Sequence, residues 1–123
     1  MKTIREQQQM FQALNDPTRL RMTHLLAKAG TPICQCECVD SLEVSPANIS
    51  RHAKLLLQAG LLEERREGKW VHYQLAKGAA ALLRAVSQGD DPMVADDLRR
   101  FQKRLRLRQG GKCLLGVQNK RFR

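Results

Sequence analysis

The chain has 123 residues, which suffices for one domain with a modest core but not for two. Aromatic residues make up only 4% of the sequence, so the core must be built from leucine, isoleucine, valine and alanine, which favours helices over a β-sandwich. No apolar stretch approaches the roughly 20 residues that span a bilayer, and the N-terminus lacks the apolar core of a signal peptide. We therefore expect a cytoplasmic protein without membrane contact.

The formal net charge of +10 is concentrated at one end of the chain. Residues 1–98 hold twelve basic and twelve acidic side chains, whereas residues 99–123 hold ten basic and no acidic ones. A high positive charge is typical of nucleic-acid-binding proteins, but here it describes the C-terminal segment rather than the body. Any argument for DNA binding must therefore come from the pattern of residues in the body.

Helix start and stop signals divide the chain into short helices. Asp16-Pro17 and Ser45-Pro46 each combine a favourable N-cap with a proline at the first helical position, and Gly30 supplies a helix stop. The expected helices cover residues 2–14, 17 to about 29, a short stretch through 39 and 42, 46 to about 59, 79–87, and 92 to about 108.

Over residues 61–75 the pattern changes to two short strands around Glu67-Gly68, which predicts a β-hairpin. Two helices with a short connection, followed by a hairpin, are typical of a winged helix-turn-helix. The predicted fold class is therefore mainly α with a small β-hairpin. We expect one domain over residues 1–108, followed by a basic mobile tail over residues 109–123.

The helix over residues 46–59 has the two faces that a DNA-reading helix needs. At about 100° per residue, Ile49, Ala53 and Leu56 fall within one narrow arc, which should pack on the core. The opposite side is polar or small and can enter the major groove, although a merely solvated face is the alternative. Its members are Ala47, Asn48, Ser50, Arg51, Lys54 and Gln58. Basic hairpin residues are placed to touch phosphates or the minor groove beside it, namely Arg65, Arg66 and Lys69.

Three of the four cysteines, Cys34, Cys36 and Cys38, lie too close together in the sequence for a useful disulfide. In a reducing compartment such a cluster indicates a ligand set or a redox site. Thiolates are soft ligands, and three of them without a nearby histidine suit a three-coordinate ion better than a tetrahedral zinc. Trivalent arsenic and antimony form three pyramidal bonds, so a site with three sulfur ligands is a natural host for them.

Three segments resemble the ArsR/SmtB family of metal-responsive winged-helix repressors: A-L-N-D-P-T-R-L-R at residues 13–21, S-P-A-N-I-S-R-H at 45–52 and G-K-W-V-H-Y at 68–73. The resemblance runs over residues 11–75. It implies a homodimer paired through its first and last helices, a palindromic operator in double-stranded DNA, and loss of DNA affinity on metal binding. The motif at 45–52 also adds Ser45 and His52 to the predicted DNA-binding residues.

The apolar stripes of the first and last helices suit that pairing, although an ordinary core would use them equally well. They are Ile4, Phe11 and Leu14 in the first helix, and Val94, Leu98, Phe101 and Leu105 in the last. Other members of the family sense zinc or cobalt through histidine and aspartate on the last helix. No histidine follows His72 here, so we do not expect that second type of site.

The arsenic-responsive members have a C-x-C motif at the start of the helix that precedes the recognition helix, and Cys34-Gln35-Cys36 matches it. Their third cysteine falls where Val39 stands here, and Cys38 lies one residue earlier. On a regular helix Cys36 points away from the other two, so three bonds to one ion would require a distorted first turn. Cys38 is therefore either a ligand or a core residue, and Cys113 is either a free tail thiol or a ligand from the tail or a partner subunit.

The sequence predicts a transcriptional repressor that binds operator DNA as a homodimer. Its predicted inducer is trivalent arsenic or antimony, bound by Cys34, Cys36 and Cys38, with no organic cofactor. The alternatives are a thiol redox-sensing repressor and a sensor of another soft metal such as cadmium, lead or zinc. A thiol enzyme would need a phosphate-type loop or a C-x-x-C motif with a base close by. The sequence has neither, so we do not expect an enzyme.

Overall fold

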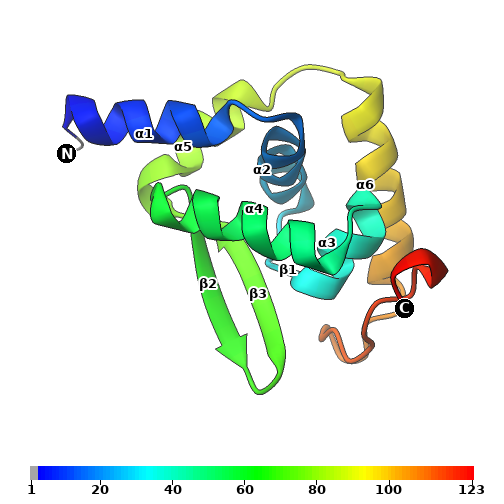
Figure 1. Ribbon diagram of the computed structural model, residues 1–123. Coiled ribbons are helices and arrows are strands. Elements are labelled where there is room, and N and C mark those ends of the chain that lie inside the picture. Colours follow the sequence, from blue (N-terminus) through cyan, green and yellow to red (C-terminus); the bar gives the residue numbers. More distant parts are fainter. Residues whose placement is uncertain (1–2) are drawn as a thin grey trace.

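The computed structural model describes residues 3–123, which form helices around a small sheet (Figure 1). The elements are α1 (Ile4–Leu14), α2 (Pro17–Ala29), β1 (Ile33–Cys34), α3 (Gln35–Leu42), α4 (Pro46–Gln58), β2 (Leu62–Glu67), β3 (Trp70–Leu75), α5 (Lys77–Val86), α6 (Pro92–Leu105) and the short 3-10 helix η1 (Lys120–Phe122). Within this part of the chain, no helix has the length and apolar character needed to cross a membrane.

The capping residues place the starts of α2 and α4 where the sequence predicted them. The Asp16 side chain accepts a hydrogen bond from the Arg19 amide at the start of α2, and the Ser45 hydroxyl accepts one from the Asn48 amide at the start of α4. Gly30 ends α2 in the left-handed conformation, with φ 69°. Toward the C-terminus, α6 ends at Leu105, three residues before the end that the sequence predicted for this helix.

The sheet has the antiparallel strand order β1-β3-β2. β2 and β3 form the predicted hairpin, but the turn lies at Gly68-Lys69, one residue later than expected, because Gly68 supplies the positive φ of 63°. β1 was not predicted, since two residues are too few to show an alternating pattern. It pairs Ile33 with Tyr73 and Cys34 with His72, and so fixes the first cysteine beside the hairpin.

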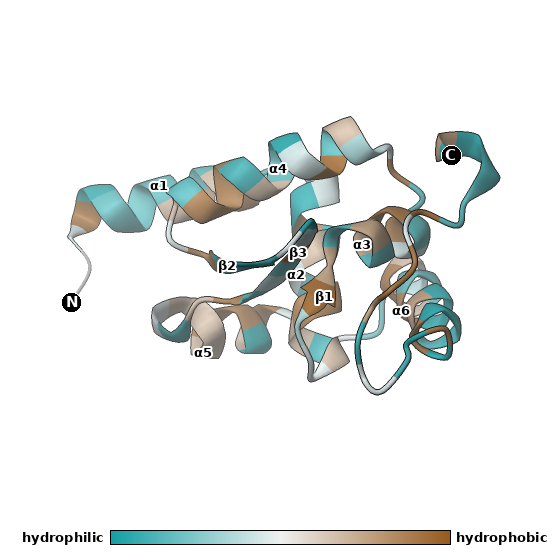
Figure 2. Cartoon of the chain, turned by 90° about the horizontal axis from the view of Figure 1, so that it is seen from below, coloured by the Kyte–Doolittle hydropathy of each residue, from teal (hydrophilic) through white to brown (hydrophobic). Residues whose placement is uncertain are grey.

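The core lies between the helices and the sheet, with α1 and α4 on one side of the hairpin and α5 on the other (Figure 2). The predicted inward arc of α4 is confirmed, because Ile49, Ala53 and Leu56 are at most 1% exposed. The α6 stripe also packs inward. The α1 stripe divides, however: Leu14 is buried, while Ile4 and Phe11 are 80% and 59% exposed.

The chain after α6 turns back on the body instead of forming the expected mobile tail. Gly110 and Gly111 adopt positive φ angles of 59° and 75° and reverse the chain, and Gln109 and Lys112 bridge across this turn. Residues 112–119, which we call the return segment, then run beside α3 and α6 (Figure 1). Hydrogen bonds of this segment to Asp40 and Arg104, which no local sequence pattern signals, hold it there.

Candidate metal centre and candidate nucleic-acid interface

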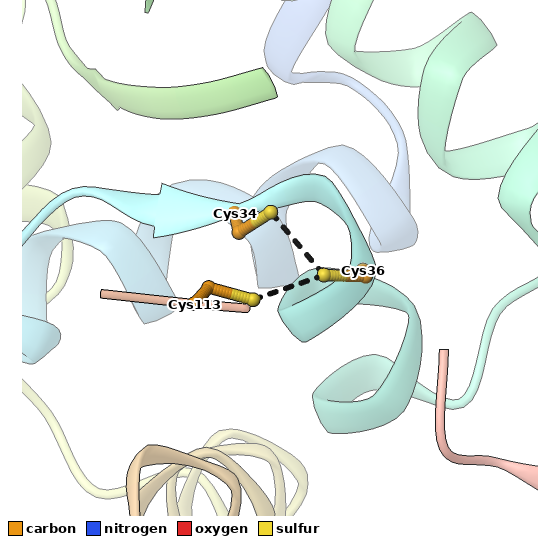
Figure 3. Close-up of side chains that lie close together, drawn as sticks. All are labelled: Cys34, Cys36 and Cys113. Carbon is orange, nitrogen blue, oxygen red and sulfur yellow. Dashed lines mark hydrogen bonds between the residues drawn. The ribbon is translucent and has the colours of Figure 1, made fainter. Parts of the chain in front are cut away.

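Three cysteine thiols meet where β1, α3 and the return segment come together (Figure 3). Cys34 is the N-cap of α3, Cys36 is in its first turn, and Cys113 is the second residue of the return segment. The Cys36 Sγ lies 3.2 Å from both the Cys34 Sγ and the Cys113 Sγ, and all three sulfur atoms are within 4.8 Å of one another. Within residues 3–123 no other group of three or more cysteine, histidine, aspartate or glutamate side chains brings its ligand atoms this close together.

Cys38 lies apart from this group, which differs from the predicted grouping of Cys34, Cys36 and Cys38. Its side chain is 1% exposed within the main hydrophobic core, and burial raises the pKa of its thiol. The reason is helical geometry, because positions two apart on a helix are separated by about 200°. Cys34 precedes the helix in extended backbone (φ −69°, ψ 147°), so its thiol reaches Cys36 without any distortion of the first turn.

A buried arginine of α6 lies against the thiols. The Arg104 Nη2 is 3.7 Å from the Cys36 Sγ and 3.8 Å from the Cys113 Sγ. It also donates hydrogen bonds to the carbonyl oxygens of residues 115 and 116, at 2.8 and 3.0 Å. The Arg104 Nε donates to the Asp40 carboxylate at 2.8 Å. Arg104 therefore joins α3, α6 and the return segment around the sulfur atoms.

A second buried ion pair fixes the backbone of Cys34. The Glu37 carboxylate, which has no solvent exposure, accepts two hydrogen bonds from the Arg108 guanidinium at 2.7 and 2.8 Å. The Glu37 Oε1 also accepts a hydrogen bond from the Cys34 amide at 2.9 Å, the reciprocal half of a capping box. The hydrogen bonds to Glu37 raise the pKa of Arg108.

The thiols share their protons unequally. Hydrogen bonds from Cys113 and Cys36 lower the pKa of the Cys34 thiol, because they stabilise its thiolate. The same contacts, together with burial, raise the pKa of Cys36. This arrangement favours the thiolate of Cys34 beside a protonated Cys36, and a soft, thiophilic ion is the kind of ligand that can displace a thiol proton.

Solutes can approach the thiols through a small pocket of about 280 Å³. Cys34 and Cys36 form part of its lining, together with Trp70 of β3, Pro46 of α4 and Val117 of the return segment. The pocket thus touches the hairpin, the first residue of α4 and the C-terminal part of the chain at once. An ion that reaches the sulfur atoms therefore lies close to the hairpin, the start of α4 and the return segment.

The predicted DNA-reading side of α4 is open to solvent. The exposed residues are Ala47, Asn48, Ser50, Arg51, Lys54 and Gln58, and in the hairpin Arg65, Arg66 and Lys69. The Arg51 Nη2 donates a hydrogen bond to the Asn48 Oδ1 at 3.1 Å, which orients two groups that are able to read base edges. Ser45 is half-buried, and its hydroxyl is used as the N-cap of α4.

His52 occupies a different position from the one expected for a DNA contact. Its side chain is buried between α2 and α4, where its Nδ1 lies 3.1 Å from the Arg19 Nη1 and 3.9 Å from the Asp16 carboxylate. Burial lowers the pKa of this histidine. The helical spacing of α4 could have revealed this position, since His52 falls beside the inward arc of Ile49, Ala53 and Leu56.

Comparison with known proteins bears on the family and the fold of the chain. A family model described as "Bacterial regulatory protein, arsR family" matches residues 16–64. The chain is 38% identical over 96 residues to the arsenic resistance transcriptional regulator ArsR1 of Pseudomonas putida, a match that covers 75% of this chain and 74% of that protein. It is 46% identical over 68 residues to the arsenical resistance operon repressor of Escherichia coli, covering 55% of this chain and 57% of that protein.

A similar solved structure is the homodimeric winged helix-turn-helix DNA-binding domain of a possible ArsR-family transcriptional regulator from Mycobacterium bovis. The TM-score is 0.62 at 26% identity, with 76% of this chain and 82% of that chain covered. The predicted fold class and the family resemblance are thus both confirmed. The helices and the hairpin form a winged helix-turn-helix body, and two ion pairs join α3 of this body to Arg104 and Arg108 near the C-terminal end of the chain. The chain belongs to the ArsR family of bacterial transcriptional regulators.

Proposed function

We propose that this chain is a repressor that binds operator DNA as a homodimer and releases it when trivalent arsenic or antimony binds Cys34, Cys36 and Cys113. The observation that carries the proposal is the meeting of three thiols, whose sulfur atoms lie within 4.8 Å of one another. The names of the Pseudomonas putida and Escherichia coli relatives, both of which refer to arsenic resistance, support the same inducer.

The donor set and its surroundings fit a trivalent metalloid. Arsenous acid would form three As–S bonds with the Cys34 thiolate and two thiols while three As–O and two S–H bonds break, and two water molecules and one hydroxide ion would leave. The product is neutral, whereas three thiolates on a divalent metal ion carry a net negative charge. Within residues 3–123 the two arginines nearest the sulfur atoms are each already paired with a carboxylate, Arg104 with Asp40 and Arg108 with Glu37, so the negative charge of such a complex would be only partly offset, by the Arg104 Nη2 that lies against the thiols. The pairing supports arsenic and antimony over cadmium and zinc.

Exposed surfaces support the remaining parts of the proposal. The outward side of α4 and the basic hairpin offer groups for base edges and phosphates. Ile4 and Phe11 leave an apolar surface on α1 that a second copy of the chain would cover. Two recognition helices related by a two-fold axis would then read the two halves of a palindromic operator.

The proposal can be tested by titrating arsenite, antimonite, Cd²⁺ and Zn²⁺ into the complex of the protein with an operator duplex. We expect arsenite and antimonite to dissociate the wild-type complex. Cys34→Ser, Cys36→Ser and Cys113→Ser should each keep operator affinity and lose at least tenfold in arsenite sensitivity. Cys38→Ala is the matched control and should respond like the wild type.

Two results would contradict the proposal. If Cys113→Ser responded like the wild type while Cys38→Ala did not, the ligand set would be the one that the sequence alone suggested. If peroxide released the operator while arsenite left it bound, the chain would be a redox-sensing repressor instead.

A further inference from the structure

The last four residues, 120–123, form an exposed cationic group that we call the basic end. Lys120, Arg121 and Arg123 are all exposed, and within residues 3–123 no carboxylate forms an ion pair with any of them. The group has a defined conformation, because the Asn119 side chain caps the Arg121 amide at 3.0 Å and Phe122 packs against the main core. Its charges are therefore held in place and not spread over a flexible chain end.

The basic end lies beside the N-terminal end of α4, in both views of the molecule (Figures 1 and 2). The chain leading to it contacts the same region, since Gly116 and Val117 line one pocket together with Pro46, the first residue of α4. In helix-turn-helix proteins the N-terminal residues of the recognition helix contact base edges in the major groove. Cations beside that end of the helix would thus face the phosphates that border the groove.

A buried carboxylate of α3 holds the chain just before the basic end. Asp40 accepts hydrogen bonds from the Gln118 amide at 2.9 Å and from the Asn119 amide at 2.8 Å, and one from Arg104 at 2.8 Å. The Asp40 side chain is 9% exposed. Hydrogen bonds to a charged, poorly solvated acceptor are among the stronger ones in proteins. Asp40 thereby fixes where the basic end projects relative to α4.

We propose that the basic end is a third DNA-contacting element, which binds the phosphate backbone beside α4 and is positioned there by Asp40. Together with α4 and the hairpin, it would contact the DNA, and its phosphate contacts would not depend on base sequence. The inference rests on the proposed function only in that the chain must bind DNA, and it is independent of what the inducer is.

The test is the salt dependence of DNA binding, measured without arsenite by fluorescence anisotropy on an operator duplex and on a scrambled duplex. The variant K120Q/R121Q/R123Q removes the cations of the basic end. The control K28Q/K77Q/R84Q removes as many exposed cations from the end of α2 and from α5, a helix on the far side of the hairpin from α4 (Figure 2). Both variants change the net charge equally.

We expect the basic-end variant to weaken binding to both duplexes by a similar factor and to leave their affinity ratio unchanged. The slope of log K against log salt should become shallower by roughly 0.9 for each phosphate that the protein no longer neutralises. The control should keep the wild-type slope. Equal slopes for the two triple variants would overturn the proposal, as would a weakening confined to the operator duplex.

Asp40→Asn tests the positioning role, because it retains every cation of the basic end. We expect it to make the slope shallower in the same direction as the basic-end variant, with an unchanged circular dichroism spectrum. A wild-type slope in Asp40→Asn would refute positioning by Asp40. Since arsenite is absent throughout, a failure of the proposed inducer response would leave these measurements unaffected, and the two outcomes can be told apart.

Discussion

At the scale of single residues, the thiol site depends on side chains that carry no sulfur. Glu37 and Asp40 are carboxylates in the first turns of a buried helix, and each meets an arginine from the far end of the chain. Arg108 and Glu37 fix the Cys34 backbone, while Arg104 and Asp40 tie the return segment to α3. Neither pair was predicted, because the partners are more than sixty positions apart and no local pattern connects them.

The Glu37–Arg108 pair should show strong coupling in a double-mutant cycle. Removing one partner of a buried ion pair leaves an uncompensated charge and costs about 3–5 kcal/mol. We expect the destabilisation caused by Glu37→Gln and by Arg108→Met to lie toward the lower end of this range, because Arg108 keeps some solvent contact. The double variant should be more stable than the sum of the single costs implies. Urea denaturation provides the free energies of unfolding.

An exposed ion pair of α6 provides the comparison. Asp96 and Arg99 form an i, i+3 pair at the surface of this helix. Their cycle should show little coupling, since solvent screens exposed pairs. Additive costs for Glu37 and Arg108 as well would mean that the buried pair does not act as a unit.

At the scale of elements, the return segment joins the thiol site to the body of the molecule. Its only cysteine, Cys113, is 2% exposed and lies beside Cys36, seventy-seven positions earlier in the chain. The sequence showed a charged, glycine-flanked stretch after the last helix, which is equally typical of a mobile tail. Hydrogen bonds hold the segment in place instead: its backbone amides donate to Asp40, and its carbonyl oxygens accept from Arg104. Because these bonds use the backbone of the segment, its side-chain composition does not reveal them.

Arsenite should protect the return segment from proteolysis. Trypsin can cut after the exposed Lys112 and Lys120 when the segment opens locally. An ion bound to Cys113 and to α3 would oppose that opening, so we expect arsenite to slow these cuts at least severalfold. Mass spectrometry of timed digests measures the rate, with cleavage after Arg5 of α1 as the internal reference.

The matched variant for this experiment is Cys113→Ser, in which arsenite should leave the cutting rate unchanged. Equal protection of the wild type and the variant would show that the ion does not engage Cys113. Protection at Arg5 as well would point to a general change in stability.

At the scale of the whole molecule, local signals predicted the fold well. N-caps, prolines and apolar periodicity predicted α2 and α4 almost to the residue, and the hairpin to within one residue, because each depends on neighbours in the chain. The grouping of the cysteine thiols was predicted only in part. Cys34 and Cys36 belong to one short motif, whereas the place of Cys113 depends on a reversal of the chain at Gly110 and Gly111 that brings distant residues together.

The exposed side of α1 bears on whether two copies of the whole molecule associate. Phe11 is 59% exposed, and Gln12 lies next to it on the same helix. We expect Phe11→Glu to shift the protein toward monomer in sedimentation velocity and to weaken operator binding at least tenfold. Gln12→Glu introduces the same charge at the neighbouring position and should preserve the wild-type state. If both variants sediment alike, Phe11 is not part of the interface.

The closeness of the three sulfur atoms has a consequence for how sensing and folding relate. The atoms are gathered by the backbone of α3, the two ion pairs and the return segment. The conformational entropy that is lost in bringing three ligands together is therefore a cost of folding and not of the binding step. Affinity for the proposed inducer and local stability of the C-terminal segment would then vary together. A substitution or a rise in temperature that loosens this segment would make the repressor less sensitive without touching a cysteine.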